Sequence, residues 1–156
     1  MATGDRRVGR TRMDYPKTYK SADELPSVLR IVREVLPRLL EGDDPILVGL
    51  RGQLRHLIVG SVELTGVGFF AELRVSPDAP AVSPARLVGG DAEIQLLGLE
   101  HGAGCVLFVE DGRLSTLEGY TYDEEWRPDA SVLSIGRVFP LEPSNARPLY
   151  GLRNHT

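Results

Sequence analysis

The sequence predicts an α+β domain in which N-terminal helices pack on a mostly antiparallel sheet of about six strands. In the first third of the chain, apolar residues recur at helical spacing, whereas from His56 onward the apolar period changes to two. The alternating segments are joined by short turns, which favours antiparallel neighbours. A length of 156 residues is sufficient for one such domain with its own core.

Two helices are expected before the strands. Residues 21–24 ("SADE") have the spacing of a capping box, and an apolar stripe follows them, formed by Val28, Leu29, Val32, Val35, Leu36, Leu39 and Leu40. Pro37 should kink or divide this helix because proline has no N–H to donate, and Gly42 is the expected stop. Asp44 suits an N-cap and Pro45 a first helical position, which predicts a short second helix over residues 45–54.

Six strands are expected after the helices. They cover residues 56–64, 67–75 and 91–99, the two arms of a hairpin around Asp111-Gly112, and residues 132–138. We expect residues 1–20 to be a disordered basic tail, residues 21–140 to be one domain, and residues 141–156 to be an irregular C-terminal tail.

The hairpin "CVLFVEDGRLSTLE" carries the strongest local signal. Asp-Gly between two alternating runs is typical of a two-residue type I′ turn, which needs positive φ at both positions. Uninterrupted pairing from that turn places Glu118 opposite Cys105, on an apolar face with Leu107, Val109 and Leu114. A carboxylate on such a face either extends to solvent, accepts a hydrogen bond from a donor such as Arg or Tyr, or has its pKa raised by burial.

Both faces of this hairpin are apolar near the turn. The second face carries Val106, Phe108 and Leu117. The hairpin should therefore be covered on both sides, by helices and loops or by a second subunit, so a homodimer stays open. Cys105 is expected to be a buried structural thiol.

The segment after the hairpin, "YTYDEEW", is the candidate binding site. It interleaves aromatic and acidic side chains, a composition that suits recognition of a basic protein partner. The expected contact residues are Tyr120, Tyr122, Asp123, Glu124, Glu125 and Trp126. The alternative is a tryptophan that faces the core and closes the sheet end, with solvated acids beside it.

The favoured function is a non-enzymatic protein-binding module. The alternative is a small enzyme or small-ligand-binding protein near the glycine-rich turn at residues 102–104, with His101 and Glu118 as an acid–base pair and Tyr120 assisting. The chain has no phosphate-binding loop, no GxSxG and no HExxH motif. Its three histidines are far apart in the sequence, so we expect no metal site and no cofactor.

The charge is unevenly distributed. Residues 1–20 hold six basic and two acidic side chains, a balance of +4, whereas the remainder holds twelve basic and twenty acidic side chains, a balance of −8. An acidic body favours basic partners and repels nucleic acid, which leaves only a weak nucleic-acid role for the basic tail. Translation from Met13 instead of Met1 would remove much of that tail.

The expected location is the cytoplasm. No apolar run approaches the ~20 residues needed to span a bilayer, and no secretory signal is visible. The single cysteine gives no internal disulfide that would indicate an oxidising compartment.

The segments "TGVGFF" and "GLEHGAGCVLFVEDGRLSTLEGYTYDEEW" resemble a pattern that recurs in small bacterial proteins of no established activity. The resemblance spans roughly residues 43–128 and implies a compact cytoplasmic α+β domain. That pattern often has proline directly after the tryptophan, whereas here Arg127 separates Trp126 from Pro128. In size and acidity the chain also resembles immunity proteins of toxin systems, which implies a role in neutralising a basic partner.

Overall fold

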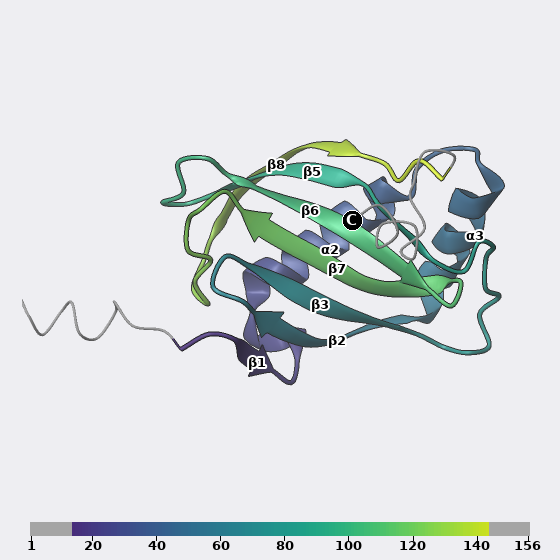
Figure 1. Ribbon diagram of the computed structural model, residues 1–156, viewed down its shortest axis with the longest axis horizontal. Coiled ribbons are helices and arrows are strands. Elements are labelled where there is room, and N and C mark those ends of the chain that lie inside the picture. The colour runs from purple at the N-terminus through teal and green to yellow at the C-terminus, as the bar shows by residue number, and fades with distance from the viewer. Residues whose placement is uncertain (1–13, 144–156) are drawn as a thin grey trace, which may run out of the picture.

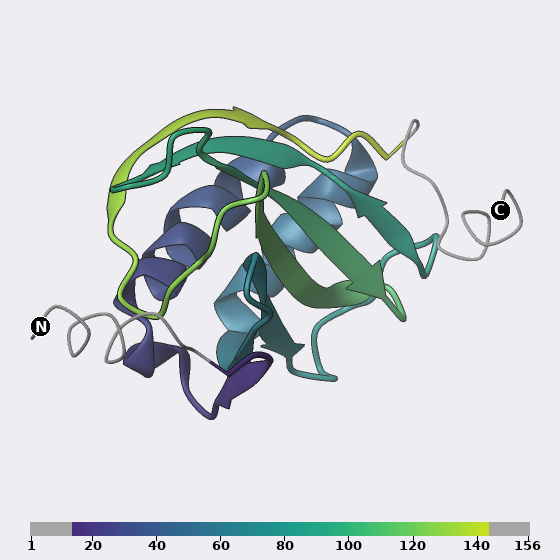
Figure 2. The same ribbon diagram turned by 60° about the vertical axis from the view of Figure 1, so that its left-hand side comes forward.

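The computed structural model describes residues 14–143, which form one curved antiparallel sheet with helices on one side (Figures 1 and 2). The elements in chain order are β1 (Lys17–Tyr19), the 3₁₀ turn η1 (Ala22–Glu24), α2 (Pro26–Leu39), α3 (Pro45–Gly52), the 3₁₀ turn η2 (Gln53–His56), β2 (Leu57–Leu64), β3 (Gly68–Val75), β4 (Leu87–Gly89), β5 (Asp91–Leu96), β6 (Ala103–Glu110), β7 (Arg113–Thr121) and β8 (Val132–Phe139).

The predicted fold, N-terminal helices packed on about six strands, is wrong. The described chain is mostly sheet, with eight strands, and its two α-helices have only 14 and 8 residues. The strands missed were β1 and β4, each of three residues, which are too short to produce a visible period of two. β1 also lies within the segment predicted to be a disordered tail, whose residues 1–13 fall outside the described part of the chain.

The strand order is β1-β2-β3-β7-β6-β5-β8, and β4 pairs with β6 beside this path. α2 contacts both β3 and β8, which are not neighbours in the sheet, because the sheet curves around it (Figure 2). The core therefore lies between α2 and the concave face. The convex face is turned toward the viewer in Figure 1.

α2 forms as the apolar stripe predicts. Val28, Ile31, Val32, Val35, Leu36 and Leu39 are all buried. Pro37 does not divide the helix, since it lies in the last turn. The capping box at Ser21 and Glu24 is present, but it caps η1 and not α2. Two arginines of α2 then fasten it to β8, because Arg38 Nη2 donates to the carbonyl of Gly136 at 2.8 Å and Arg30 Nη1 to that of Val132 at 3.3 Å.

The two-residue turn at Asp111-Gly112 is confirmed, with φ of 55° and 74° and with Glu110 opposite Arg113. The predicted register beyond it is wrong. A bulge at Ser115 shifts the pairing by one residue, so that Glu118 lies opposite Val106 and Gly119 opposite Cys105. The cause is the three-residue spacing of Leu114 and Leu117, both of which are buried: only an extra residue between them lets both side chains face the core.

The C-terminal part of the described chain is also anchored. The amide of Leu141 donates to the carbonyl of Leu39 at 2.7 Å, and the Leu141 side chain is buried. The irregular tail predicted for residues 141–156 therefore begins with a core residue, and its residues 144–156 lie outside the described part of the chain.

Candidate functional site

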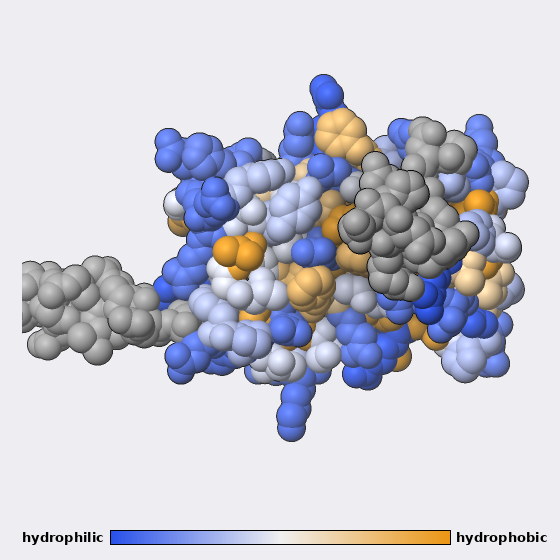
Figure 3. Space-filling view, viewed as in Figure 1, coloured by the Kyte–Doolittle hydropathy of each residue, from blue (hydrophilic) through white to orange (hydrophobic). Residues whose placement is uncertain are grey.

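The outer face of the sheet is the convex face, turned away from α2. Its side chains alternate along each strand with those of the core. The outer face is formed by Glu63 of β2; Phe70, Glu72 and Arg74 of β3; Thr116, Glu118 and Tyr120 of β7; Val106 and Phe108 of β6; and Glu93 and Gln95 of β5. Figure 3 shows apolar patches on this face separated by hydrophilic ones.

Glu118 lies near the middle of the outer face. The strand register forms a row in which Phe70 and Val106 are its Cα partners on either side, and Glu63 follows beyond Phe70. Within residues 14–143 no side chain or backbone group donates a hydrogen bond to its carboxylate. Burial among these neighbours raises the pKa of Glu118. The carboxylate is thus half-buried beside apolar side chains and has no described partner.

The Tyr120 side chain is hydrogen-bonded within the sheet and is not free to contact a partner. Its hydroxyl donates to Asp91 Oδ1 at 3.1 Å, and the same oxygen accepts the amide of Cys105 at 3.2 Å. The ring lies across Gly104, where a Cβ would come within 2.6 Å of the hydroxyl. Burial and the nearby charge of Asp91 raise the pKa of Tyr120. Tyr120 therefore ties β7 to β5 across Gly104, where an added Cβ would press on the Tyr120 ring and the Asp91 carboxylate.

Two of the predicted contact acids hold loops together. The Glu124 carboxylate accepts the backbone amides of Glu100 at 2.9 Å and His101 at 3.1 Å, and these bonds lower its pKa. Glu125 accepts the hydroxyl of Tyr15 at 2.8 Å and pairs with Arg127 at 3.5 Å. These carboxylates fix the β5–β6 connection and the segment before β1.

Trp126 was wrongly placed in the contact surface. It is 1% exposed and packs edge-on against Phe69, with ring centroids 5.0 Å apart. Of the six predicted contact residues, Tyr122 and Asp123 are exposed, and the Tyr122 side chain interacts with Tyr120. Tyr122 is 48% exposed, and its ring packs edge-on against that of Tyr120, with ring centroids 5.7 Å apart.

The structure does not bring the proposed acid–base pair together. Glu118 lies in β7 opposite Val106 of β6, whereas His101 lies in the β5–β6 connection, before β6 begins at Ala103. His101 instead lines a cleft of about 340 Å³ together with Asp91, Glu93 and Tyr122. No group of three or more potential metal ligands occurs within residues 14–143.

The formal net charge of the described residues is more negative than the −4 of the full chain. Residues 14–143 hold twelve Lys and Arg against twenty-one Asp and Glu, a difference of −9. Several arginines are engaged inside the molecule; Arg51 and Arg113, for example, donate to backbone carbonyls. On the outer face Arg74 pairs with Glu72 at 3.0 Å, which leaves Glu63, Glu93 and Glu118 as acids in excess.

No protein-family model, curated protein or solved structure matches the chain. The resemblance to small bacterial proteins and the cytoplasmic location therefore stay predictions. None of the described helices has the length and apolar character required to cross a bilayer.

Proposed function

We propose that the chain is a non-enzymatic protein-binding module whose outer face receives a basic protein partner, in the manner of an immunity protein that neutralises a toxin. The observation that supports this most directly is the half-buried Glu118 between Phe70 and Val106, which has no partner among the described residues. An arginine or lysine of a partner would supply the missing positive charge.

The surroundings of Glu118 suit a protein ligand. Phe70 is 38% exposed and Tyr122 48%, so both offer apolar area at the same face. Aromatic side chains are good interface anchors, and an ion pair at the centre of an interface contributes most when water is excluded around it. The acid excess of the outer face would also attract a basic partner from a distance.

The alternative function, an enzyme or small-ligand binder, has less support. It depended on His101 and Glu118 acting on one substrate, but His101 lies in the β5–β6 connection and lines a cleft that Glu118 does not line. His101 and Tyr122 do line one cleft, but their hydrogen-bond geometry includes no nucleophile–base contact.

The test is affinity purification with the full chain as bait, comparing wild type with Glu118→Lys and Phe70→Ser. We expect wild type to retain one basic protein, and either variant to retain about tenfold less of it. The amount retained by wild type should fall as the salt concentration is raised. Glu41→Lys is the matched control, because Glu41 is exposed at the end of α2, away from the outer face.

Equal retention by wild type and Glu118→Lys would contradict the proposal, as would a bait that retains no protein above background. Circular dichroism of each variant confirms that the fold persists. If wild type self-associates and Glu118→Lys does not, the partner of the outer face is a second copy of the chain and not a basic protein.

A further inference from the structure

The edge of the sheet at β2 is only partly covered. β1 pairs with β2 from Val62 to Leu64, and no described strand lies beside residues 57–61 on that side. An uncovered strand edge presents backbone N–H and C=O groups that can pair with another chain. Five residues of β2 are therefore open to strand addition.

The direction of the backbone groups follows from one hydrogen bond. The amide of Ser76 donates to the carbonyl of His56 at 3.2 Å, so His56 and Ile58 direct their backbone groups toward β3. Leu57 and Val59 then direct theirs to the free edge. The Leu57 amide already donates to the carbonyl of Leu54, which leaves the Leu57 carbonyl and both groups of Val59 for an added strand.

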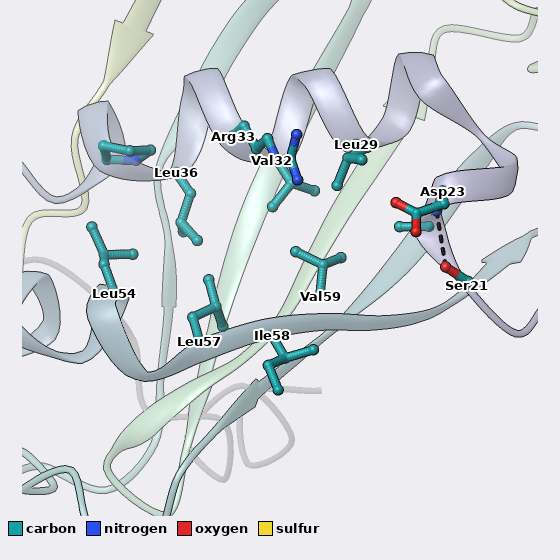
Figure 4. A pocket seen from close by; sticks show the side chains of 12 residues that line it. Ser21, Asp23, Leu29, Val32, Arg33, Leu36, Leu54, Leu57, Ile58 and Val59 are labelled. Atoms are coloured by element: carbon teal, nitrogen blue, oxygen red, sulfur yellow. Dashed lines mark hydrogen bonds between the residues drawn. The ribbon is translucent and has the colours of Figure 1, made fainter.

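A groove runs along this edge between α2 and β2 (Figure 4). Leu29, Val32 and Leu36 of α2 form one wall, and Leu54, Leu57 and Val59 form the other, around a volume of about 470 Å³. Figure 4 shows Leu57 and Val59 pointing toward α2, whereas Ile58 points away from it. Ile58 is 67% exposed at the rim.

We propose that this groove binds an extended peptide segment of a partner protein, which adds to β2 as a strand beside residues 57–61. The peptide would continue the sheet edge where β1 ends, so the added strand extends a ladder that already exists. Alternate peptide side chains would enter the apolar groove, and the peptide backbone would pair with Val59.

The chemistry of the groove distinguishes a peptide from a small apolar molecule. An apolar molecule would fill the space between Leu29 and Val59 but would leave the backbone groups of Val59 without a partner. Two charged side chains also line the groove: Asp23 lies at its η1 end, and Arg33 lies on the α2 wall beside Val32. We expect a bound peptide to have apolar residues at every second position and a basic residue near Asp23.

This site is separate from the outer face, because the Leu57 and Val59 side chains that form its β2 wall point toward α2. The two proposals can therefore fail independently. The probe is a phage-displayed library of random linear ten-residue peptides, selected on the full chain, with the enriched peptides then synthesised. Leu29→Gln changes the groove wall, and Val48→Gln, an exposed position on α3, is the matched control.

We expect the enriched peptides to alternate apolar and polar residues and to bind Leu29→Gln at least about tenfold more weakly than Val48→Gln. On wild-type protein, N-methylation of alternate peptide amides should abolish binding, and N-methylation of the intervening amides should not. Hydrogen exchange at the Val59 amide should slow when the peptide binds.

Three results would overturn the proposal. The first is the absence of any enriched peptide. The second is equal binding of the peptides that are N-methylated at alternate amides and of those that are N-methylated at the intervening amides. The third is loss of peptide binding in Glu118→Lys with retention in Leu29→Gln, which would place the peptide on the outer face. Dimerisation that Leu29→Gln abolishes would identify a second copy of the chain as the occupant instead of a peptide.

Discussion

Gln53 is fully buried, and its side chain connects three segments that are distant in sequence. Its Nε2 donates to the carbonyls of Pro80 and Gly112, both at 3.0 Å, and its Oε1 accepts the amide of Leu114 at 3.0 Å. The sequence placed Gln53 inside a second helix, without a role. The side chain in fact supports the Asp111-Gly112 turn, since it hydrogen-bonds to the Gly112 carbonyl within the turn and to the Leu114 amide that follows it.

Gln53→Leu should lower the free energy of unfolding by about 1–3 kcal/mol, because the Leu114 amide would remain buried without a hydrogen-bond partner. Urea unfolding measures the change. Gln95→Leu, at an exposed position of β5, should change the free energy by less than about 0.5 kcal/mol. Similar losses in both variants would contradict the structural role of Gln53.

The raised pKa of Glu118 makes stability depend on pH. The folded protein holds this proton more tightly than the unfolded chain does. The resulting stabilisation is fully present below the unfolded pKa of about 4.3 and is lost as pH rises through the folded pKa. The same carboxylate that would attract a basic partner therefore weakens the isolated fold at neutral pH.

Glu118→Gln should consequently become more stable relative to wild type as pH rises from 4 to 7, because glutamine carries no charge to desolvate. Urea unfolding at a series of pH values gives the difference in the free energy of unfolding. A difference that stays constant over this range would show that the fold does not disfavour the ionised form of Glu118.

At the scale of elements, β3 and β7 approach closely because residue 119 of β7 is a glycine and has no side chain. A Cβ at Gly119 would lie 2.1 Å from Cε2 of Phe69, whose ring is fully buried and packs against Trp126. Phe69 and Gly119 are Cα partners across the two strands. This glycine therefore lets an aromatic ring lie flat over the neighbouring strand and close the sheet end.

Gly119→Ala should lower the free energy of unfolding by about 1–3 kcal/mol through overpacking. Gly136→Ala in β8 is the matched control, since the nearest atom to its added Cβ would be 3.6 Å away, and its effect should stay within about 0.5 kcal/mol. Thermal or urea unfolding measures both. An unchanged Gly119→Ala protein would show that Phe69 and Trp126 can repack.

At the scale of the whole molecule, Cys105 lies in β6 near the middle of the sheet and is fully buried. Burial and the charge of Asp91 raise the pKa of its thiol to about 12. Cys105 belongs to the buried core cluster between the sheet and the helices, so a reagent reaches the thiol only when the domain opens.

Cys105 should react with a thiol reagent at least about 10³-fold more slowly in the native protein than in urea, because the fraction unfolded is small. The chain has one cysteine, so the signal has one origin. The labelling rate should rise in Gly119→Ala by the same factor as the equilibrium constant of unfolding. Rapid native labelling that is unaffected by this variant would show local opening of β6 alone.

The features that depend only on neighbouring residues could be predicted from the order of amino acids. Positive φ at Asp111 and Gly112 makes a two-residue turn wherever those residues stand between two strands, and the apolar stripe of α2 forms a helix with one buried side. Local preference is sufficient for these elements because their hydrogen bonds close within a few residues.

Tertiary structure alone decided which face each side chain occupies. The core requires both Leu114 and Leu117, and this requirement inserts the bulge at Ser115 that moves Glu118 to the outer face. Trp126 is buried because Phe69, 57 residues earlier, lies beside it, and the edge of β2 is open because β1 ends after three residues. Such placements depend on contacts between distant segments, whose net energy no local pattern of residues records.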